Sequence, residues 1–193
     1  MKIVAFNGSP RKNGNTEILL EEGLGVAEKA GIETELVHIG AGKVKRGCTA
    51  CYACVEKKNG YCVFTDDIVN ECVDKILAAD AILLGSPVYF TDVTAEMKGL
   101  IDRAGYAILH KGPLLRRKIG ASVVAQRRGG AVHTFDTMNH FFQISGMIIP
   151  GSTYWNFGVG LGIGEVSADE EAIRNMRDLG DNITWLLQSL VKK

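Results

Sequence analysis

The 193-residue sequence lacks an excess of charge of either sign, because 22 lysines and arginines balance 22 aspartates and glutamates. A chain without net charge generates no field that would draw it to nucleic acid or to an acidic membrane. Long apolar runs are also missing: residues 78–85 are interrupted by Asp80 and fall far short of a membrane-spanning helix. We therefore expect a protein that binds neither nucleic acid nor a membrane.

A secretion signal is missing too, since the apolar residues 3–6 near the start of the chain are too few to form one. We therefore expect a soluble, cytoplasmic protein, in which the five cysteines do not form a disulfide framework. The length predicts one domain over residues 1–193, which would bury roughly 70% of the surface that the unfolded chain exposes. Such a chain needs no metal in order to fold.

Short apolar runs alternate with amphipathic helical patterns, which is typical of β-α-β units and of a parallel sheet covered on both faces. Strands are expected at residues 2–7, 33–39, 81–85, 119–125 and 147–149. Helices are expected at residues 16–30, 66–79, 94–109, 132–145 and 167–190, the last opened by an S-x-x-E capping box. The pattern predicts an α/β fold of flavodoxin type: a doubly wound, five-stranded parallel sheet that binds ligands beyond the carboxyl ends of its strands.

Residues 8–16, which follow the first strand, are small and polar and lead directly into a helix. Such a loop directs backbone N–H groups and a positive helix end at one point, which is a phosphate-binding arrangement. It is neither a Walker loop, because Asn15 stands in place of the nucleotide-binding lysine, nor a G-x-G-x-x-G fingerprint. The loop suits a terminal phosphate monoester, held by Ser9, Arg11, Asn15 and Thr16. An ordinary polar turn with a helix cap is the alternative.

Two further loops are expected beside this one at the same edge of the sheet. Residues 85–94 include Tyr89 and Phe90, which can form apolar walls for a flat ring. Residues 125–130 end in two glycines, which let the backbone approach a ligand closely. The three loops together predict one pocket. The aromatic and glycine-rich segment 150–165 either covers that pocket or forms a plain surface loop.

Four of the cysteines form the pattern C-x2-C-x2-C-x7-C, at Cys48, Cys51, Cys54 and Cys62. Spacings of two residues let a tight loop direct successive thiolates at one metal centre, and a threefold run of cysteines begins the bacterial ferredoxin pattern. Zinc sites usually pair two separate C-x2-C units, so the contiguous run favours one iron–sulfur cluster over zinc. A bare thiol loop, structural or redox-active, is the remaining alternative. Cys72 lies at helical spacing with apolar residues and is expected in the core.

Three motifs together resemble the NAD(P)H-dependent FMN reductase superfamily. They are G-S-P-R-x-x-G-N-T at residues 8–16, the cysteine segment followed by T-D-D-I at 65–68, and G-S-P-V-Y-F…M-K-G-L-I-D-R at 85–103. The compact cysteine motif is most similar to that of the iron–sulfur flavoproteins. The resemblance is strong up to Arg103 and looser through residues 127–130. It implies FMN on a flavodoxin-like fold, an oligomer with the flavin near a subunit interface, and a [4Fe-4S] cluster in a loop, residues 47–65, inserted after the second strand.

The resemblance also implies which residues hold each cofactor. The FMN phosphate would be bound by Ser9, Arg11, Asn13, Asn15 and Thr16. The ring would be lined by Pro87, Val88, Tyr89 and Phe90, with Gln126, Arg127, Gly129 and Gly130 on its far side. The cluster ligands would be Cys48, Cys51, Cys54 and Cys62.

FMN itself supplies hydride and electron chemistry, so the protein needs to contribute only orientation, electrostatics and access. No catalytic acid or base is expected, and the four histidines show no spacing typical of a metal site. The sequence predicts an FMN-dependent oxidoreductase: an iron–sulfur flavoprotein with a ferredoxin-like donor, or an NAD(P)H-driven reductase of flavins, quinones or related small-molecule acceptors. A non-enzymatic electron carrier or redox sensor is the alternative, although the balanced charge gives no sign of the acidic face that a carrier uses for docking. A homodimer or homotetramer is expected, because three short loops leave one side of the flavin open and the resembling family closes it with a neighbouring subunit.

Overall fold

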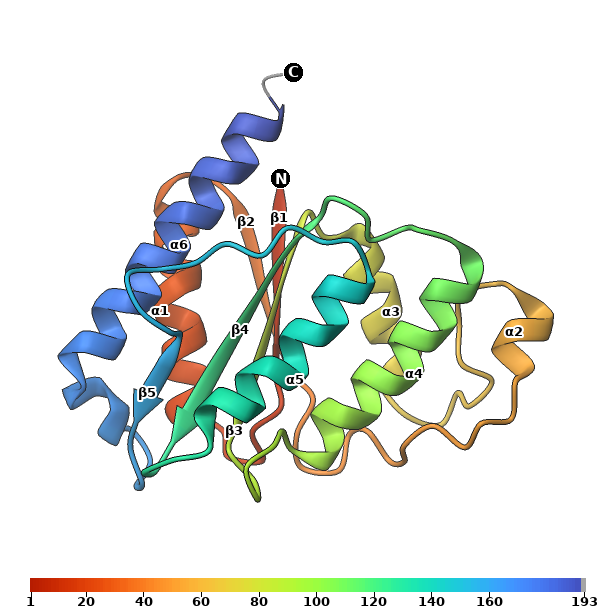
Figure 1. Cartoon of the computed structure of the whole chain (residues 1–193), viewed down its shortest axis with the longest axis horizontal. Helices are drawn as coiled ribbons and strands as arrows, with labels where there is room; N and C mark the ends of the chain where they lie inside the picture. The colour runs from red at the N-terminus through yellow and green to blue at the C-terminus, as the bar shows by residue number, and fades with distance from the viewer. Residues whose placement is uncertain (192–193) are drawn as a thin grey trace.

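Five parallel strands form one sheet in the order β2-β1-β3-β4-β5 in the computed structural model, which describes residues 1–191 (Figure 1). The strands are β1 (Lys2–Asn7), β2 (Glu33–His38), β3 (Ala81–Pro87), β4 (Ile119–Gln126) and β5 (Phe157–Val159). This is the doubly wound parallel sheet that the sequence predicts. Because β2 and β3 lie on opposite sides of β1, the chain reverses its winding there, and a crevice is expected at the carboxyl ends of β1 and β3.

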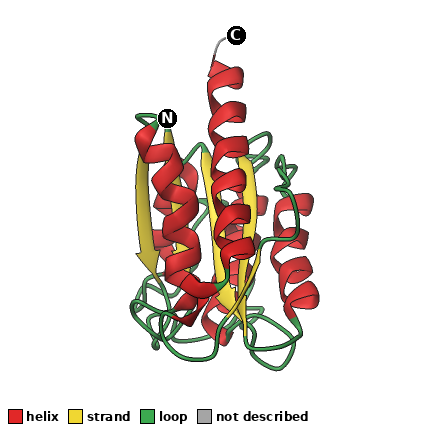
Figure 2. Ribbon diagram, turned by 90° about the vertical axis from the view of Figure 1, so that its left-hand side faces the viewer, coloured by secondary structure: helices red, strands yellow, loops and turns green. Residues whose placement is uncertain are grey.

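Helices cover both faces of the sheet (Figures 1 and 2). The elements of one face are α1 (Asn15–Lys29) and α6 (Glu170–Val191), and those of the other are α3 (Val69–Ala78), α4 (Ala95–Lys111) and α5 (Ala131–Ile144). Successive residues of β1 point to opposite faces, so Ile3 packs in the core beneath α1 and α6, and Val4 packs beneath the other three helices. Among residues 1–191, no helix has both the length and the apolar composition that a membrane span requires.

The fifth strand was wrongly predicted at residues 147–149. There, Ile148 forms only a single parallel bridge to Ile119, and the chain then leaves the sheet at Pro150, which has no N–H to donate. It returns as β5, whose residues pair with Val124, Ala125 and Gln126 at the end of β4. β5 contains Gly158, where a side chain would lie 2.5 Å from Val166. Close packing therefore requires glycine at this position of β5. The same glycine makes the segment look like a loop in the sequence.

Two helix starts also differ from the prediction. α6 begins at Glu170 instead of Ser167, because residues 165–168 form a short 3-10 helix. The carboxylate of Asp169 then accepts hydrogen bonds from the N–H groups of Ala172 and Val159, at 3.1 and 2.9 Å. The cap of α6 is thus also a tie to β5, which a capping-box pattern cannot reveal. α3 begins at Val69 instead of Asp66, since Asp66 and Asp67 have other partners described below.

Candidate functional site

A pocket of about 140 Å³ opens at the carboxyl ends of the central strands, and it is called the strand-end pocket below. Its lining comes from the three predicted loops and from one further segment. The residues are Ser9, Pro10, Arg11, Asn15, Thr16, Pro87, Val88, Tyr89, Ala125, Gln126, Arg127, Gly160 and Leu161. Most of the residues expected to bind a cofactor thus surround one cavity. Gly160 and Leu161 were not predicted individually, and the aromatic and glycine-rich segment that contains them was expected either to cover the pocket or to form a plain surface loop.

The loop between β1 and α1 is shaped by Asn7, the buried last residue of β1. The side-chain oxygen of Asn7 accepts a hydrogen bond from Ser9 N–H at 2.9 Å, and its amide donates to Glu17 at 3.1 Å. Glu17 also accepts from the backbone N–H of Asn13, which has a left-handed φ of 53°. These contacts fold the loop into a turn that leads into the start of α1. Asn13 therefore acts through its backbone and lies outside the lining of the pocket.

The first turn of α1 presents a donor set that fits a phosphate. Its N–H groups have no acceptor within the helix, and the N-cap residue is Gly14, which has no side chain to cap them. Thr16 in this turn is 1% exposed, and Ser9 is also buried. Both hydroxyl-bearing residues line the pocket beside the guanidinium-bearing Arg11. Hydroxyls, a cation and a positive helix end are the groups that bind a phosphate monoester.

Residues 160–166, called the glycine strap below, are held against the start of α1. Arg11 donates to Leu161 O at 3.0 Å, and Asn15 donates to Gly162 O at 2.9 Å. Asn15 also accepts a hydrogen bond from Val166 N–H at 3.3 Å. In this structure, two of the residues expected at a phosphate therefore contact the strap instead. A phosphate in the pocket would compete with the strap carbonyls for these donors.

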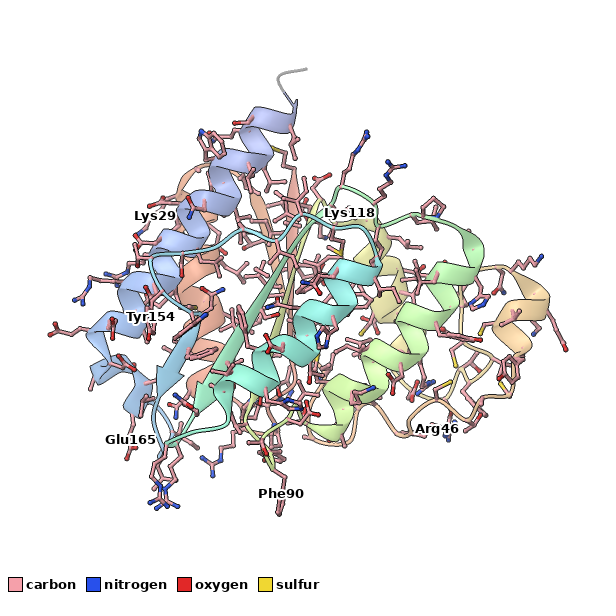
Figure 3. All side chains as sticks on the ribbon, viewed as in Figure 1. Lys29, Arg46, Phe90, Lys118, Tyr154 and Glu165 are labelled. Carbon is pink, nitrogen blue, oxygen red and sulfur yellow. The ribbon has the colours of Figure 1, made fainter. Side chains whose placement is uncertain are left out.

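The β3–α4 loop contributes Pro87, Val88 and Tyr89 to the pocket, but the structure turns Phe90 away from it. Phe90 and Thr91 have left-handed φ angles of 49° and 64°, in a tight turn closed by paired hydrogen bonds between Tyr89 and Asp92. The side chain of Phe90 is fully exposed and projects from the molecule (Figure 3). Gly129 and Gly130, expected on the far side of the ring, line an adjoining hollow together with Gln126.

His38, at the end of β2, contacts the loop between β1 and α1. Its Nε2 atom lies 2.6 Å from Ser9 O. Because the carbonyl can only accept, the ring carries its proton on Nε2. The next close approach is at Gly40, where a Cβ atom would lie 2.0 Å from Ser9 O. No role was expected for His38, and only its position at a strand end next to this loop could have suggested one.

The four clustered cysteines surround a second, smaller hollow of about 20 Å³. They lie between β2 and α3, around the short helix α2 (Ala53–Lys57), which in Figure 1 is separated from the sheet by α4. Cys48 and Cys51 are exposed, and Cys54 and Cys62 are half-buried. The hollow is closed by aromatic and apolar groups and one cation: Tyr52, Val63, Phe64, Tyr106 and Arg103. The structure therefore brings the four cysteines of the sequence pattern to one hollow.

The cysteine arrangement does not match a site for one metal ion. Within residues 1–191, no group of three or more His, Cys, Asp and Glu side chains is placed to hold a single ion. Thiolates that each bind a different iron of one cluster lie farther apart than thiolates that share one ion. Ala50 and Tyr52 adopt left-handed φ angles of 52° and 57°, which cost energy in residues other than glycine. Both residues lie between cysteines of the segment and line the same hollow.

Cys72 lies apart from this group, in the core beneath α3 and α4. Burial raises the pKa of its thiol to about 12. It therefore stays protonated near neutral pH and is a packing residue, as the sequence predicts.

Comparisons with known proteins identify relatives over most of the chain. Residues 1–161 match the family described as NADPH-dependent FMN reductase. An iron-sulfur flavoprotein of Methanocaldococcus jannaschii is 38% identical over 200 residues, which cover 100% of both chains. The crystal structure of RosB with a bound 8-demethyl-8-formylriboflavin-5'-phosphate superposes with a TM-score of 0.70 at 20% identity, covering 100% of this chain and 81% of RosB. A flavodoxin from the domain Archaea superposes with a TM-score of 0.63 at 15% identity, covering 97% and 99%. At these identities, the two structures establish a flavodoxin-like fold.

Proposed function

Because the chain belongs to the NADPH-dependent FMN reductase family, and is thus an FMN-dependent oxidoreductase, we propose that it is an iron–sulfur flavoprotein with one [4Fe-4S] cluster. The observation that carries this proposal is the gathering of Cys48, Cys51, Cys54 and Cys62 around one hollow. The relative from M. jannaschii bears the same name and aligns over its full length. We further propose that residues 1–193 form a single FMN-binding domain, with residues 47–65 as its cysteine-bearing insertion.

The strand-end pocket supports FMN as its ligand. We propose that the N–H groups of the first turn of α1, with Ser9, Thr16 and Arg11, bind the phosphate, and that Asn15 joins them when it leaves the glycine strap. Asn13 fixes the turn of the same loop. The ring is assigned to Pro87, Val88 and Tyr89 on one side, with Gln126, Arg127, Gly129 and Gly130 on the other. Phe90 lies outside the lining of the pocket, so it can contact a flavin only where the flavin extends past the edge of the pocket.

FMN, when bound, accepts a hydride or single electrons. The chain's own contribution is to orient the ring, to hold the phosphate and to limit the access of water. No side chain in the pocket is needed as an acid or base for this role. We propose a ferredoxin-like protein as the electron donor through the cluster, with NAD(P)H as the alternative donor directly to the flavin, and a small molecule as the acceptor.

The test is the analysis of anaerobically produced protein for iron, sulfide and FMN. We expect about four irons per chain, flavin bands and broad iron–sulfur absorption in the same spectrum. Alanine at any of the four clustered cysteines should remove the cluster and stop reduction by a ferredoxin, with FMN still bound. Cys72→Ala is the matched control and should change neither. Less than one iron per chain after careful reconstitution would overturn the cluster and leave an FMN reductase with a bare thiol loop.

The donor is tested separately by anaerobic mixing with reduced ferredoxin, NADH and NADPH. Rapid flavin reduction by ferredoxin, which is lost in the cysteine variants, is the expected result. Reduction by NADPH at the same rate in all cysteine variants would instead assign the donor role to the nucleotide.

A further inference from the structure

The base of the cysteine segment contains a buried cation, Arg103, which extends from α4 and is 2% exposed. Its two terminal nitrogens contact both oxygens of Asp67, at 2.5 and 3.0 Å, and this carboxylate is buried as well. One of these nitrogens also donates to Arg46 O at 3.2 Å. Removing such a pair of charges from water carries a large desolvation penalty, so its position calls for an explanation.

The third nitrogen of the guanidinium, Nε, is directed at a cysteine. Arg103 Nε lies 3.4 Å from Cys62 Sγ. Asp67 cannot follow a movement of the guanidinium, because it also accepts hydrogen bonds from the N–H groups of Lys45 and Val69, at 3.1 and 3.3 Å. The planar fork of Arg103 is thus fixed on one side by the carboxylate and presents its Nε–H to the sulfur on the other.

The backbone of Cys62 is held as well. The side chain of Asn70 accepts from Cys62 N–H and donates to Cys62 O, both at 2.9 Å. It also donates to Phe64 O at 3.3 Å. Cys62 therefore has three ties to α3 and α4, whereas Cys48 and Cys51 lie exposed on an irregular segment. The thiol of Cys62 is therefore held in position by contacts with α3 and α4.

We propose that Arg103 is a positioning residue for Cys62, which holds this sulfur as the preformed ligand and raises the midpoint potential of the cluster. The inference rests on the proposed function. A charge-assisted hydrogen bond draws electron density from a thiolate, and hydrogen bonds to ligand sulfurs are among the factors that set cluster potentials. Reduction adds one negative charge beside a buried cation, which stabilises the reduced state. Asp67 lies on the other side of the guanidinium from Cys62, and its negative charge opposes this stabilisation in part.

Two substitutions should therefore shift the potential in opposite directions. Arg103→Met removes the cation and the sulfur hydrogen bond, so the cluster potential should fall. Asp67→Asn removes the opposing charge, so the potential should rise, and it keeps an oxygen for one of the two N–H groups, of Lys45 and Val69, that bond to different oxygens of the carboxylate. Arg103→Lys keeps the cation without the fork and should lie between Arg103→Met and the wild type.

Arg46→Met is the matched control. Arg46 is a cation of the same segment, and its guanidinium lies 4.7 Å from the centre of the Phe64 ring. It is paired with the exposed Asp66 and has no contact with a cysteine sulfur among its bonds in the described part of the chain. Because solvent screens a partly exposed charge more than a buried one, its removal should change the potential much less.

The experiment is an anaerobic redox titration of the FMN-containing protein, with the cluster followed by its own paramagnetic signal. FMN and iron contents are measured for every variant as a check on folding and assembly. Shifts of opposite sign at Arg103 and Asp67, with a small shift at Arg46, support the proposal. Shifts of the same sign, or none, overturn it, because a general loosening of the loop would explain them. Should Arg103→Met fail to hold iron, the sign of the Asp67→Asn shift decides alone. Iron below one atom per wild-type chain instead refutes the proposed function, before any variant is compared.

Discussion

Thr16 is the residue whose expected role can be tested most directly, because its hydroxyl is buried at the start of α1 and lines the strand-end pocket. Thr16→Val keeps the shape of the side chain and removes only the hydroxyl. A hydrogen bond to a charged phosphate contributes about 1.5 kcal/mol, so the Kd for FMN should rise roughly tenfold. Riboflavin has no phosphate, and its affinity should stay unchanged in a fluorescence titration. Equal affinity of the wild type for riboflavin and FMN would contradict phosphate binding by this loop.

The residue types of the loop predicted the hydrogen-bond donors of this pocket, but not the acceptors that these donors contact in the structure. Arg11 and Asn15 are versatile hydrogen-bonding side chains, and nothing local to residues 8–16 indicates that they contact carbonyls about 150 residues away. Phe90 shows the same limit for geometry. An aromatic residue after a strand suggested a wall of the pocket, yet its left-handed φ points the ring into solvent. Such an angle normally marks glycine or asparagine, so phenylalanine gave no sign of it.

At the scale of elements, Asn15 joins α1 to the glycine strap and thereby determines how firmly the strap is closed. Asn15→Ala removes the bonds to Gly162 O and Val166 N–H. At about 1 kcal/mol for each neutral bond, amide exchange in residues 160–166 should accelerate by roughly tenfold or more. Thr153→Val is a suitable control, since Thr153 bonds to Asn175 and Asp178 elsewhere on α6. Unchanged exchange at Val166 in Asn15→Ala would show that other contacts hold the strap.

The cysteine segment is closed at its two ends by an ion pair between Arg46 and Asp66, with atoms 2.6 and 2.7 Å apart. The hydrogen bonds from Arg46 lower the pKa of Asp66 to about 2. An unfolded aspartate titrates near pH 4, so the pair stabilises the fold above about pH 4 and loses this contribution as the pH falls toward 2.

Asp66→Asn should therefore flatten the pH dependence of thermal unfolding between about pH 4 and 2, measured on protein without a cluster. The effect should be small and should shrink in high salt, because both side chains are partly exposed. Identical pH profiles for the variant and the wild type would exclude a stabilising role for this pair.

The long elements could be predicted because periodicity reports burial. β1, β3 and β4 are apolar along almost their whole length because both of their faces are covered. α1 ends where Gly31, with φ of 79°, allows the chain to turn back, and Gly31 and Ile32 N–H groups bond to the last turn of the helix. β5 escaped prediction because its three residues include a glycine that packing demands. The short helix α2 was not predicted, because its segment was interpreted only by the spacing of its cysteines.

At the scale of the whole molecule, topology explains why the strand-end pocket was predicted more completely than the surroundings of the cysteines. Parallel strands on either side of the switch point must bring their carboxyl ends together, so three loops far apart in the sequence meet. The position of the cysteine segment beyond α4 depends instead on side-chain contacts such as that between Arg103 and Asp67. No periodicity encodes these contacts. In Figure 1, the segment around α2 lies beyond α4, away from the sheet.

Apolar side chains remain exposed on the two segments that contribute Tyr89 and Leu161 to the strand-end pocket: Tyr89, Phe90, Leu161 and Ile163. They belong to the β3–α4 loop and to the glycine strap, on the two sides of the pocket. Exposed apolar side chains on the segments beside a ligand site are typical of a protein contact. We expect a homodimer or homotetramer that covers these side chains and closes the open side of the flavin.

Sedimentation velocity at micromolar concentration checks this expectation on FMN-loaded protein. The wild type should sediment as a dimer or tetramer, and Phe90→Ser with Ile163→Ser should shift it toward the monomer and weaken FMN binding. Trp185 is equally exposed but lies on α6, away from the lining of the pocket. Trp185→Ser should leave both properties unchanged, because an interface that closes the flavin must lie at the pocket mouth. A wild-type monomer with FMN bound would contradict the assembly. An oligomer broken only by Trp185→Ser would place the interface on α6 and leave the flavin open to solvent.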